Sequence, residues 1–259
     1  METNFTLKQN SKNISEHVKH KILVMSGKGG VGKTTVAVNL ANMLSKKGFS
    51  VGLLDIDIHG PDVAKMLGLE NKRITAENEK ILPIKYVDNF KIVSVSFMTD
   101  ESNKAIIWRG PLKHSLIKQC LEDVKWGNLD FLILDFPPST GDESISAVQM
   151  VSGAKSIIVS SPQELSIFDA RKAIDFSVQF NVPVIGIIEN MSGDIFGKGT
   201  IKKIAEEYNI DFLGNLSLNK EIIDSAQKGE PLSEKAEKAY YEFSYIVENI
   251  LNDLGEKKK

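Results

Sequence analysis

The chain alternates short apolar runs with longer stretches in which apolar residues recur at helical spacing. Most of the short runs are apolar at every position, which is typical of strands buried on both faces of a parallel sheet. Parallel strands are joined by crossovers, and the intervening helical stretches supply them. From Lys21 onward the pattern therefore predicts a doubly wound α/β fold with a mostly parallel sheet. Strands are expected at 22–25, 51–54, 92–95, 131–134, 157–159 and 184–188, and 212–216 are a candidate for a late strand.

The two ends of the chain differ from this pattern. Residues 1–20 are polar and rich in lysine without a clear period, so we expect a flexible N-terminal leader. Residues 21–259 contain no Pro-, Gly- or Ser-rich linker and are predicted to form a single domain. Near the C-terminus an apolar stripe predicts a helix packed on the sheet. A membrane-targeting helix has a similar stripe, but the acidic residues between these positions disfavour anionic lipid. The stripe consists of Phe243, Ile246, Val247, Ile250, Leu251 and Leu254.

Composition narrows the classes of partner. The 259 residues include 32 Lys and Arg against 34 Asp and Glu, a balance that offers no long-range attraction for nucleic acid or an anionic membrane. No apolar segment reaches the roughly 18 residues that a membrane-spanning helix needs. We therefore expect a cytoplasmic protein that binds neither nucleic acid nor membrane. The single cysteine, Cys120, rules out a disulfide within the chain and any C-x-x-C pair.

A glycine-rich segment between the first predicted strand and a helix over 35–47 fits the pattern G-x-x-x-x-G-K-[ST]. Its backbone N–H groups and the helix N-terminus would surround phosphate, Lys33 would reach the β- and γ-phosphates, and the Thr34 hydroxyl would bind Mg²⁺. A tight strand-to-helix turn is the plainer alternative. The predicted ATP-binding residues of this segment are Gly27, Lys28, Gly29, Gly30, Val31, Gly32, Lys33, Thr34 and Thr35.

Acidic side chains follow two predicted strands, at the sheet edge where open α/β sheets bind ligands. Asp55 and Asp57 end the second strand, and Asp135 ends a later one. Mg²⁺ keeps several waters and needs few protein oxygens. Asp135 is therefore predicted to hold Mg²⁺ through water, with helix capping as the alternative. Asp55 is a second candidate for the metal site, supporting the ion indirectly, or it caps the following turn.

The segment K-G-G-V-G-K-T-T resembles the deviant Walker A motif of the MinD/ParA/nitrogenase-iron-protein class of P-loop ATPases. The resemblance implies that Lys28 reaches across a homodimer interface to the partner's phosphates, where a cation stabilises developing charge as an arginine finger does. A solvated lysine is the alternative. It also implies that Asp57 orients the attacking water, which makes Lys28, Lys33 and Asp57 the catalytic candidates. Asn190 would bind the adenine edge with its amide, unless it only forms a turn.

Three further motifs, D-I-D-I-H-G-P-D, I-I-W-R-G-P-L-K and L-D-F-P-P-S-T-G-D-E, resemble the Mrp/ApbC-type iron–sulfur cluster carrier ATPases. The stiff segment 137–142 would act as a switch that senses the γ-phosphate. Trp108 and Arg109 are equally compatible with a dimer or partner contact and with plain packing. His59 is interpreted as a turn residue, because phosphoryl transfer depends on positioning and charge more than on a strong base.

The resemblance breaks at the cysteines. In the resembled carriers a C-x-x-C pair follows the E-N-M-S segment, and two such pairs hold a cluster in a dimer. Here residues 189–193 run directly into D-I-F-G-K-G. Cys120 lies in a predicted helix over 113–124 and is interpreted as a small buried hydrophobe. An iron–sulfur cluster is implied by the family but is not supported by this chain's own ligands.

Two classes of function remain open at this point, beside a kinase or synthetase for which no acceptor pocket is recognised. The first is a Mg²⁺-dependent, dimeric ATPase that acts in iron–sulfur cluster assembly or transfer, with ATP and Mg²⁺ as cofactors. Its partners would be a scaffold or apo-protein acceptors. The second is a MinD/ParA-like positioning or regulatory switch without a cluster. Both place residues 21–259 in a single P-loop ATPase domain.

Overall fold

The computed structural model describes residues 17–98, 110–138 and 140–256. An eight-stranded sheet runs in the order β10-β9-β8-β1-β7-β2-β6-β5, and its neighbouring strands are parallel except for β5 with β6. Its strands are β1 (Val18–Met25), β2 (Val51–Asp55), β5 (Ile84–Val87), β6 (Phe90–Ser94), β7 (Leu129–Asp135), β8 (Lys155–Ser160), β9 (Val184–Ser192) and β10 (Phe212–Ser217). A separate antiparallel pair consists of β3 (Thr75–Glu77) and β4 (Lys80–Leu82).

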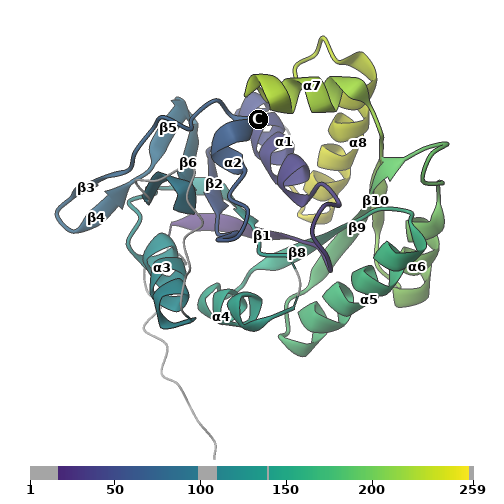
Figure 1. Cartoon of the computed structure of the whole chain (residues 1–259), viewed down its shortest axis with the longest axis horizontal. Coiled ribbons are helices and arrows are strands. Elements are labelled where there is room, and N and C mark those ends of the chain that lie inside the picture. Colours follow the sequence, from purple (N-terminus) through teal and green to yellow (C-terminus); the bar gives the residue numbers. More distant parts are fainter. Residues whose placement is uncertain (1–16, 99–109, 139, 257–259) are drawn as a thin grey trace, which may run out of the picture.

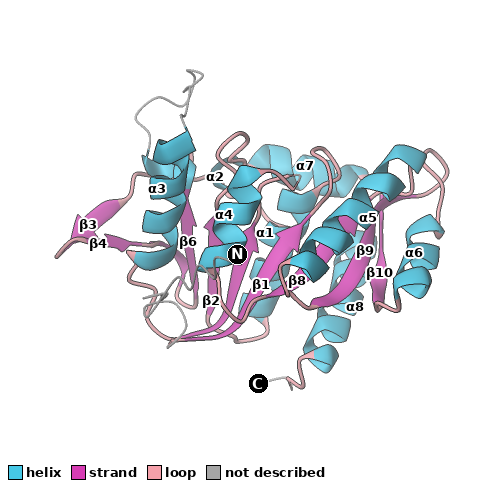
Figure 2. Ribbon diagram, turned by 90° about the horizontal axis from the view of Figure 1, so that it is seen from below, coloured by secondary structure: helices cyan, strands magenta, loops and turns pink. Residues whose placement is uncertain are grey.

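Helices cover both faces of the sheet (Figures 1 and 2). One layer contains α1 (Lys33–Lys46), α2 (Val63–Met66), α7 (Lys220–Lys228) and α8 (Glu237–Asp253), and the other contains α3 (Gly110–Glu122), α4 (Asp142–Met150), α5 (Glu164–Gln179) and α6 (Thr200–Tyr208). A short 3₁₀ helix, Val95–Met98, follows β6. Alternate residues of one strand enter the two cores: Ile22 and Val24 pack under α1, whereas Leu23 and Met25 face the other layer. This arrangement confirms the predicted doubly wound fold.

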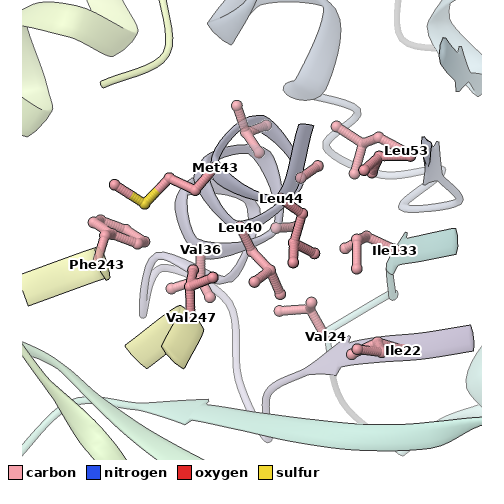
Figure 3. Close-up of a cluster of buried hydrophobic side chains, with 14 of the residues drawn as sticks. Ile22, Val24, Val36, Leu40, Met43, Leu44, Leu53, Ile133, Phe243 and Val247 are labelled. Atoms are coloured by element: carbon pink, nitrogen blue, oxygen red, sulfur yellow. The ribbon is translucent and has the colours of Figure 1, made fainter. Parts of the chain in front are cut away.

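The core on the α1 side is built from α1, α8 and the central strands (Figure 3). Leu40 and Leu44 of α1 lie toward the strands, and Phe243 and Val247 come from α8. Every apolar position of the C-terminal stripe is buried here except Leu254, which is partly buried. The stripe is therefore occupied by packing against this core. No helix in the described ranges is both long and apolar enough to cross a membrane.

The element boundaries differ from the expectation at several places. β1 begins at Val18, so the last residues of the expected leader, 18–20, are part of the sheet, and residues 1–16 lie outside the described residues. α3 begins at Gly110 rather than at 113. The strands β3, β4 and β5 were not expected, because their alternation of polar and apolar residues spans only three or four positions. Trp108, Arg109 and Ser139 lie outside the described residues.

Candidate nucleotide-binding site

The glycine-rich segment connects β1 to α1 at the carboxyl edge of the sheet. Gly32 has φ 84° and directly precedes α1. Packing requires glycine at two positions of this segment, and at Gly32 the backbone conformation favours glycine as well. A Cβ on Gly27 would lie 1.8 Å from the Asp169 carbonyl oxygen of α5, and one on Gly32 would lie 2.1 Å from Asn190 Nδ2. Helix α5 and strand β9 therefore hold the loop from two sides.

Lys33, the first residue of α1, is 6% exposed and points at two carboxylates. Its Nζ donates to Asp135 Oδ1 at 2.6 Å and lies 3.5 Å from Asp57 Oδ2. Burial alone would lower the pKa of the Lys33 ammonium, but Asp135 and Asp57 together raise that pKa above its ordinary value. The ammonium is therefore charged at neutral pH, although almost no water reaches it.

Asp135 stands at the end of β7 directly beside Asp55 at the end of β2. Asp135 Oδ2 accepts a hydrogen bond from Thr34 Oγ1 at 2.7 Å. Burial raises the pKa of Asp135, and the charge of Lys33 with the hydrogen bonds from Lys33 and Thr34 opposes that rise. The lysine and the hydroxyl expected to bind phosphate and Mg²⁺ thus meet on one carboxylate.

Asp55 is fully buried, and both of its oxygens accept hydrogen bonds from its own chain. Oδ1 accepts from the Asp57 N–H at 3.1 Å and Oδ2 from Ser94 Oγ at 2.8 Å. Burial, followed by the charge of Asp135, raises the pKa of Asp55 well above its usual range. The bond from the Asp57 N–H is the one that turn capping requires, and an indirect role of Asp55 at the metal fits the same geometry.

The donor set fits Mg²⁺. Asp57 and Asp135 share the ammonium of Lys33, and the buried Asp55 stands directly beside Asp135, so a divalent cation would help to balance the charge of these carboxylates. No group of three or more His, Cys, Asp or Glu side chains in the described residues could by itself hold a metal. A Mg²⁺ site does not need such a group, because Mg²⁺ takes one or two protein ligands and completes its coordination shell with water and phosphate oxygens. Thr34 and Asp135 are the residues that would hold it.

The loop after β2 links Asp57 to the start of α4, directly after the expected switch segment 137–142. Asp57 Oδ1 accepts from the Gly60 N–H at 3.3 Å. Two residues beyond Asp57, His59 Nε2 lies 3.1 Å from Glu143 Oε1 in the first turn of α4. The Asp57 loop therefore contacts the residue directly after the expected switch segment 137–142, which their separation in the sequence does not reveal.

A pocket of about 350 Å³ opens beside the phosphate loop. Gly32, Thr35, Asn190 and Met191 form its inner wall, and Asn190 Nδ2 donates to the Val31 carbonyl oxygen at 2.7 Å. The outer walls come from elements that the sequence did not point to. They are Asp62, Lys65 and Met66 at α2, and Ser217, Leu218, Asn219, Ile222, Ile223, Ala226 and Gln227 from the end of β10 to α7. Apolar walls beside a phosphate loop suit a nucleoside.

A larger hollow of about 610 Å³ lies elsewhere, at the edge strand β10. Lys198, Lys202, Tyr241 and Tyr245 are among its lining residues, and none of the phosphate-loop residues is. Size alone therefore does not identify the site. The position of the smaller pocket against Gly32 and Thr35 does.

Lys28 is half-buried on the phosphate loop. Its carbonyl oxygen accepts a hydrogen bond from Ser26 Oγ at 2.9 Å. Its ammonium makes no hydrogen bond or ion pair with any residue that the structure describes. The side chain is thus available to a partner, as the resemblance implies, and a solvated charge fits the same observation.

Cys120 is inaccessible to solvent, and its Sγ lies 3.8 Å from Met98 Sδ. Burial, followed by the charge of Asp55, raises the pKa of the thiol to about 12. A cluster ligand must be a thiolate. Where the resembled carriers have their cysteine pair, Gly193 and Gly197 exchange two backbone hydrogen bonds of 2.9 and 2.8 Å, which closes a tight turn.

Comparison with known proteins places this site in a family. A family model described as the NUBPL iron-transfer P-loop NTPase matches residues 17–252. The chain belongs to this family. An iron–sulfur cluster carrier protein of Methanocaldococcus jannaschii is 43% identical, over 93% of this chain and 87% of that protein. The cytosolic Fe-S cluster assembly factor CFD1 of Kluyveromyces lactis is 40% identical, over 91% of each chain. The resemblance to iron–sulfur carriers is confirmed, and this member has only one cysteine.

Solved structures agree with this assignment. A nucleotide-binding protein of Archaeoglobus fulgidus in complex with ADP is 32% identical, with a TM-score of 0.76 over 90% of this chain and 96% of that one. The septum site-determining protein MinD of Pyrococcus horikoshii, complexed with Mg-ADP, has a TM-score of 0.70 at 24% identity over 89% and 95% of the two chains. The second likeness is one of fold. The NUBPL-family chain described here thus has the MinD/ParA type of P-loop fold.

Proposed function

We propose that this protein is a Mg²⁺-dependent ATPase that hydrolyses ATP as a homodimer and acts in iron–sulfur cluster assembly or transfer. The convergence of Lys33, Thr34, Asp57 and Asp135 at the N-terminus of α1 carries the proposal. Lys33 would bind the β- and γ-phosphates. Thr34, and Asp135 through water, would hold Mg²⁺, which would supply charge neutralisation at the phosphoryl oxygens. Asp57, within 3.5 Å of the Lys33 ammonium, orients the attacking water.

The nucleoside pocket supports adenine nucleotides as the substrate class. The pocket begins at Thr35, one residue beyond the proposed Mg²⁺ ligand, so a nucleotide whose phosphates lie in the loop places its base against Asn190 and Met191. An amide side chain offers a donor and an acceptor to the adenine edge. The ADP bound by the related Archaeoglobus fulgidus protein is consistent with this assignment.

The second half of the proposal concerns the dimer. Lys28 has an ammonium that its own chain does not engage within the described residues, on the loop that holds the phosphates. In a homodimer with the two loops facing each other, this ammonium reaches the partner's phosphates and stabilises the charge that develops on them.

The cargo role rests on family membership, and the chemistry of this chain limits it. The only thiol is buried and neutral, so two copies do not supply the four thiolates of an ordinary cluster. We infer that the ATPase acts on a cluster that a scaffold or an apo-protein acceptor holds, with ATP binding and hydrolysis controlling the association.

Steady-state hydrolysis of Mg-ATP tests the enzymatic half. The parent should hydrolyse ATP, Lys33→Ala should abolish hydrolysis, and Lys28→Ala should lower kcat while the affinity for nucleotide stays at the parental value. Turnover of Lys28→Ala at the parental rate would refute the role across the dimer. Because Lys33 itself binds phosphate, folding of both variants is checked by urea unfolding, and nucleotide affinity measured by calorimetry is the control for Lys28→Ala.

Anaerobic incubation with iron and sulfide tests the cargo half. The parent and Cys120→Ala are both expected to hold no iron above background. A stoichiometric cluster on the parent that Cys120→Ala loses would show that Cys120 is a ligand after all, and the chain would then be a carrier rather than a partner of one.

A further inference from the structure

One segment of the chain, residues 57–68, touches both ends of the proposed nucleotide site. Asp57 begins it, beside Lys33 at the phosphate end. Asp62, Lys65 and Met66 line the nucleoside pocket at the other end. A bound base and the position of the attacking water would therefore be sensed by the same stretch of backbone. This observation deepens the proposed function and rests on it.

Consecutive hydrogen bonds join the two ends of the segment. The Asp57 carboxylate accepts from the Gly60 N–H at 3.3 Å, and the Gly60 carbonyl accepts from the Asp62 N–H at 2.8 Å. The Asp62 carbonyl in turn accepts from the Met66 N–H at 3.0 Å. A displacement of Met66 in the pocket is thus transmitted through this short path to the Asp57 side chain.

Helix α2 is suited to move as one piece. Val63, Ala64 and Leu67 are buried in the core under α1, so this helical turn and Leu67 are packed as one unit. Lys65 and Met66 line the pocket opposite α7, and Met66 also packs, partly buried, against the same core. Close-packed protein interiors shift between discrete arrangements rather than deform locally. Occupation of the pocket would therefore reposition the whole helix.

The far ends of α2 and α7 meet at two glycines, where the helices lie side by side (Figure 1). Gly68 follows the end of α2 with φ 64°, and Gly229 follows α7 with φ 71°. A Cβ on Gly229 would lie 2.8 Å from both N and Cα of Gly68 and 3.3 Å from the Lys65 carbonyl oxygen. The two pocket walls are therefore joined by a backbone contact that admits no side chain.

We propose that α2, held against α7 at the Gly68–Gly229 contact, makes the base of the bound nucleotide a determinant of where Asp57 lies. The base then contributes to turnover as well as to affinity. A polyphosphate without a nucleoside fills the phosphate loop but leaves α2 and Asp57 in a less productive position.

Hydrogen exchange provides the test without depending on hydrolysis. Exchange rates of the parent protein are measured in saturating Mg-ADP and in saturating Mg-pyrophosphate, two ligands that differ only in the nucleoside. The backbone amides of 58–66 should exchange roughly fivefold or more slowly with ADP than with pyrophosphate, a ratio at the lower end of common couplings between sites. Equal protection by the two ligands would overturn the proposal while leaving nucleotide binding intact. Failure of both ligands to bind would refute the proposed function itself.

Three glycine variants distinguish disruption of the Gly68–Gly229 contact from the backbone strain that any side chain causes at a positive φ. In Gly229→Ala the amides of 58–66 should exchange at the same rate with ADP as with pyrophosphate. Its kcat for ATP should fall toward the kcat for tripolyphosphate, which has the phosphates but no nucleoside. Gly255→Ala is the matched control, because Gly255 has φ 69° but nothing within 4 Å of its added Cβ. Gly68→Ala, whose Cβ would meet the Gly229 oxygen at 3.1 Å, serves as the milder second variant. An unchanged difference in both contact variants would show that the glycines do not couple the walls.

Discussion

Lys33→Met should destabilise the folded protein in a pH-dependent way. The substitution removes the ammonium that lies 2.6 Å from Asp135 and 3.5 Å from Asp57 and keeps an apolar chain of similar length. Both carboxylates are buried, and Asp135 already has a raised pKa. Without Lys33 the pKa of Asp135 rises further, because its largest opposing charge is gone.

The free energy of unfolding that Lys33→Met can lose through one such carboxyl group has an upper limit. An unpaired buried carboxyl group can take up a proton, and this costs about 1.36 kcal/mol for each pH unit above its ordinary pKa of about 3.9. At about pH 7 the ceiling is roughly 4 kcal/mol, and at about pH 5 it is roughly 1.5 kcal/mol. Since the folded-state pKa lies above the unfolded one, the folded form binds the extra proton between the two values, and stability rises as pH falls through that window.

Urea unfolding of the parent and of Lys33→Met at both pH values measures this effect. We expect the free energy of unfolding of Lys33→Met to be roughly 2–4 kcal/mol below that of the parent at about pH 7, and this deficit should shrink by more than half at about pH 5. The double variant Lys33→Met with Asp135→Asn is the control and should be more stable than Lys33→Met alone, since one unpaired charge has been removed. A deficit that is absent at neutral pH, or that does not shrink on acidification, would refute the reasoning.

Three further predictions follow from other parts of the structure. Phe243→Ala should lower the free energy of unfolding by about 3–5 kcal/mol, because a fully buried ring in the α1–α8 core is lost. A change below about 1 kcal/mol in a urea titration would mean that α8 does not pack on this core. Cys120, with a thiol pKa of about 12, should not react with a thiol reagent near neutral pH until the protein is unfolded, so rapid labelling of the folded protein would contradict its burial. His59→Ala removes the contact with Glu143, which joins the Asp57 loop to α4 directly after the expected switch segment. It should lower kcat more than nucleotide affinity, with His59→Gln recovering part of the loss, and equal losses in both quantities would indicate a general distortion.

The fold class and the phosphate loop could be predicted from the sequence. Strands that are apolar at every position must be buried on both sides, and their alternation with helical stretches leaves few arrangements other than a doubly wound sheet. The short strands β3, β4 and β5 could not be predicted, because none of their residues is fully buried and their runs are too short to show a period. The start of β1 at Val18 was missed because the run of three polar residues, 19–21, hides the strand there.

The candidate site divides in the same way. The sequence by itself determined which chemical groups the protein has: the loop glycines, Lys28, Lys33 and Thr34, the aspartates at strand ends, and a lone cysteine in place of a cysteine pair. These follow from residue type and local spacing, and they agree with the family to which the chain belongs.

Only the tertiary structure decided how those groups pair. Lys33 meets Asp135 across 102 positions of sequence, because the crossover topology places β7 next to β1. Asp55 is occupied by Ser94 and its own turn, and the nucleoside pocket takes its outer walls from α2 and α7, which meet at Gly68 and Gly229. Spacing along a chain sets local periodicity, whereas contacts between distant segments depend on how the sheet and its two helical layers pack around a common core.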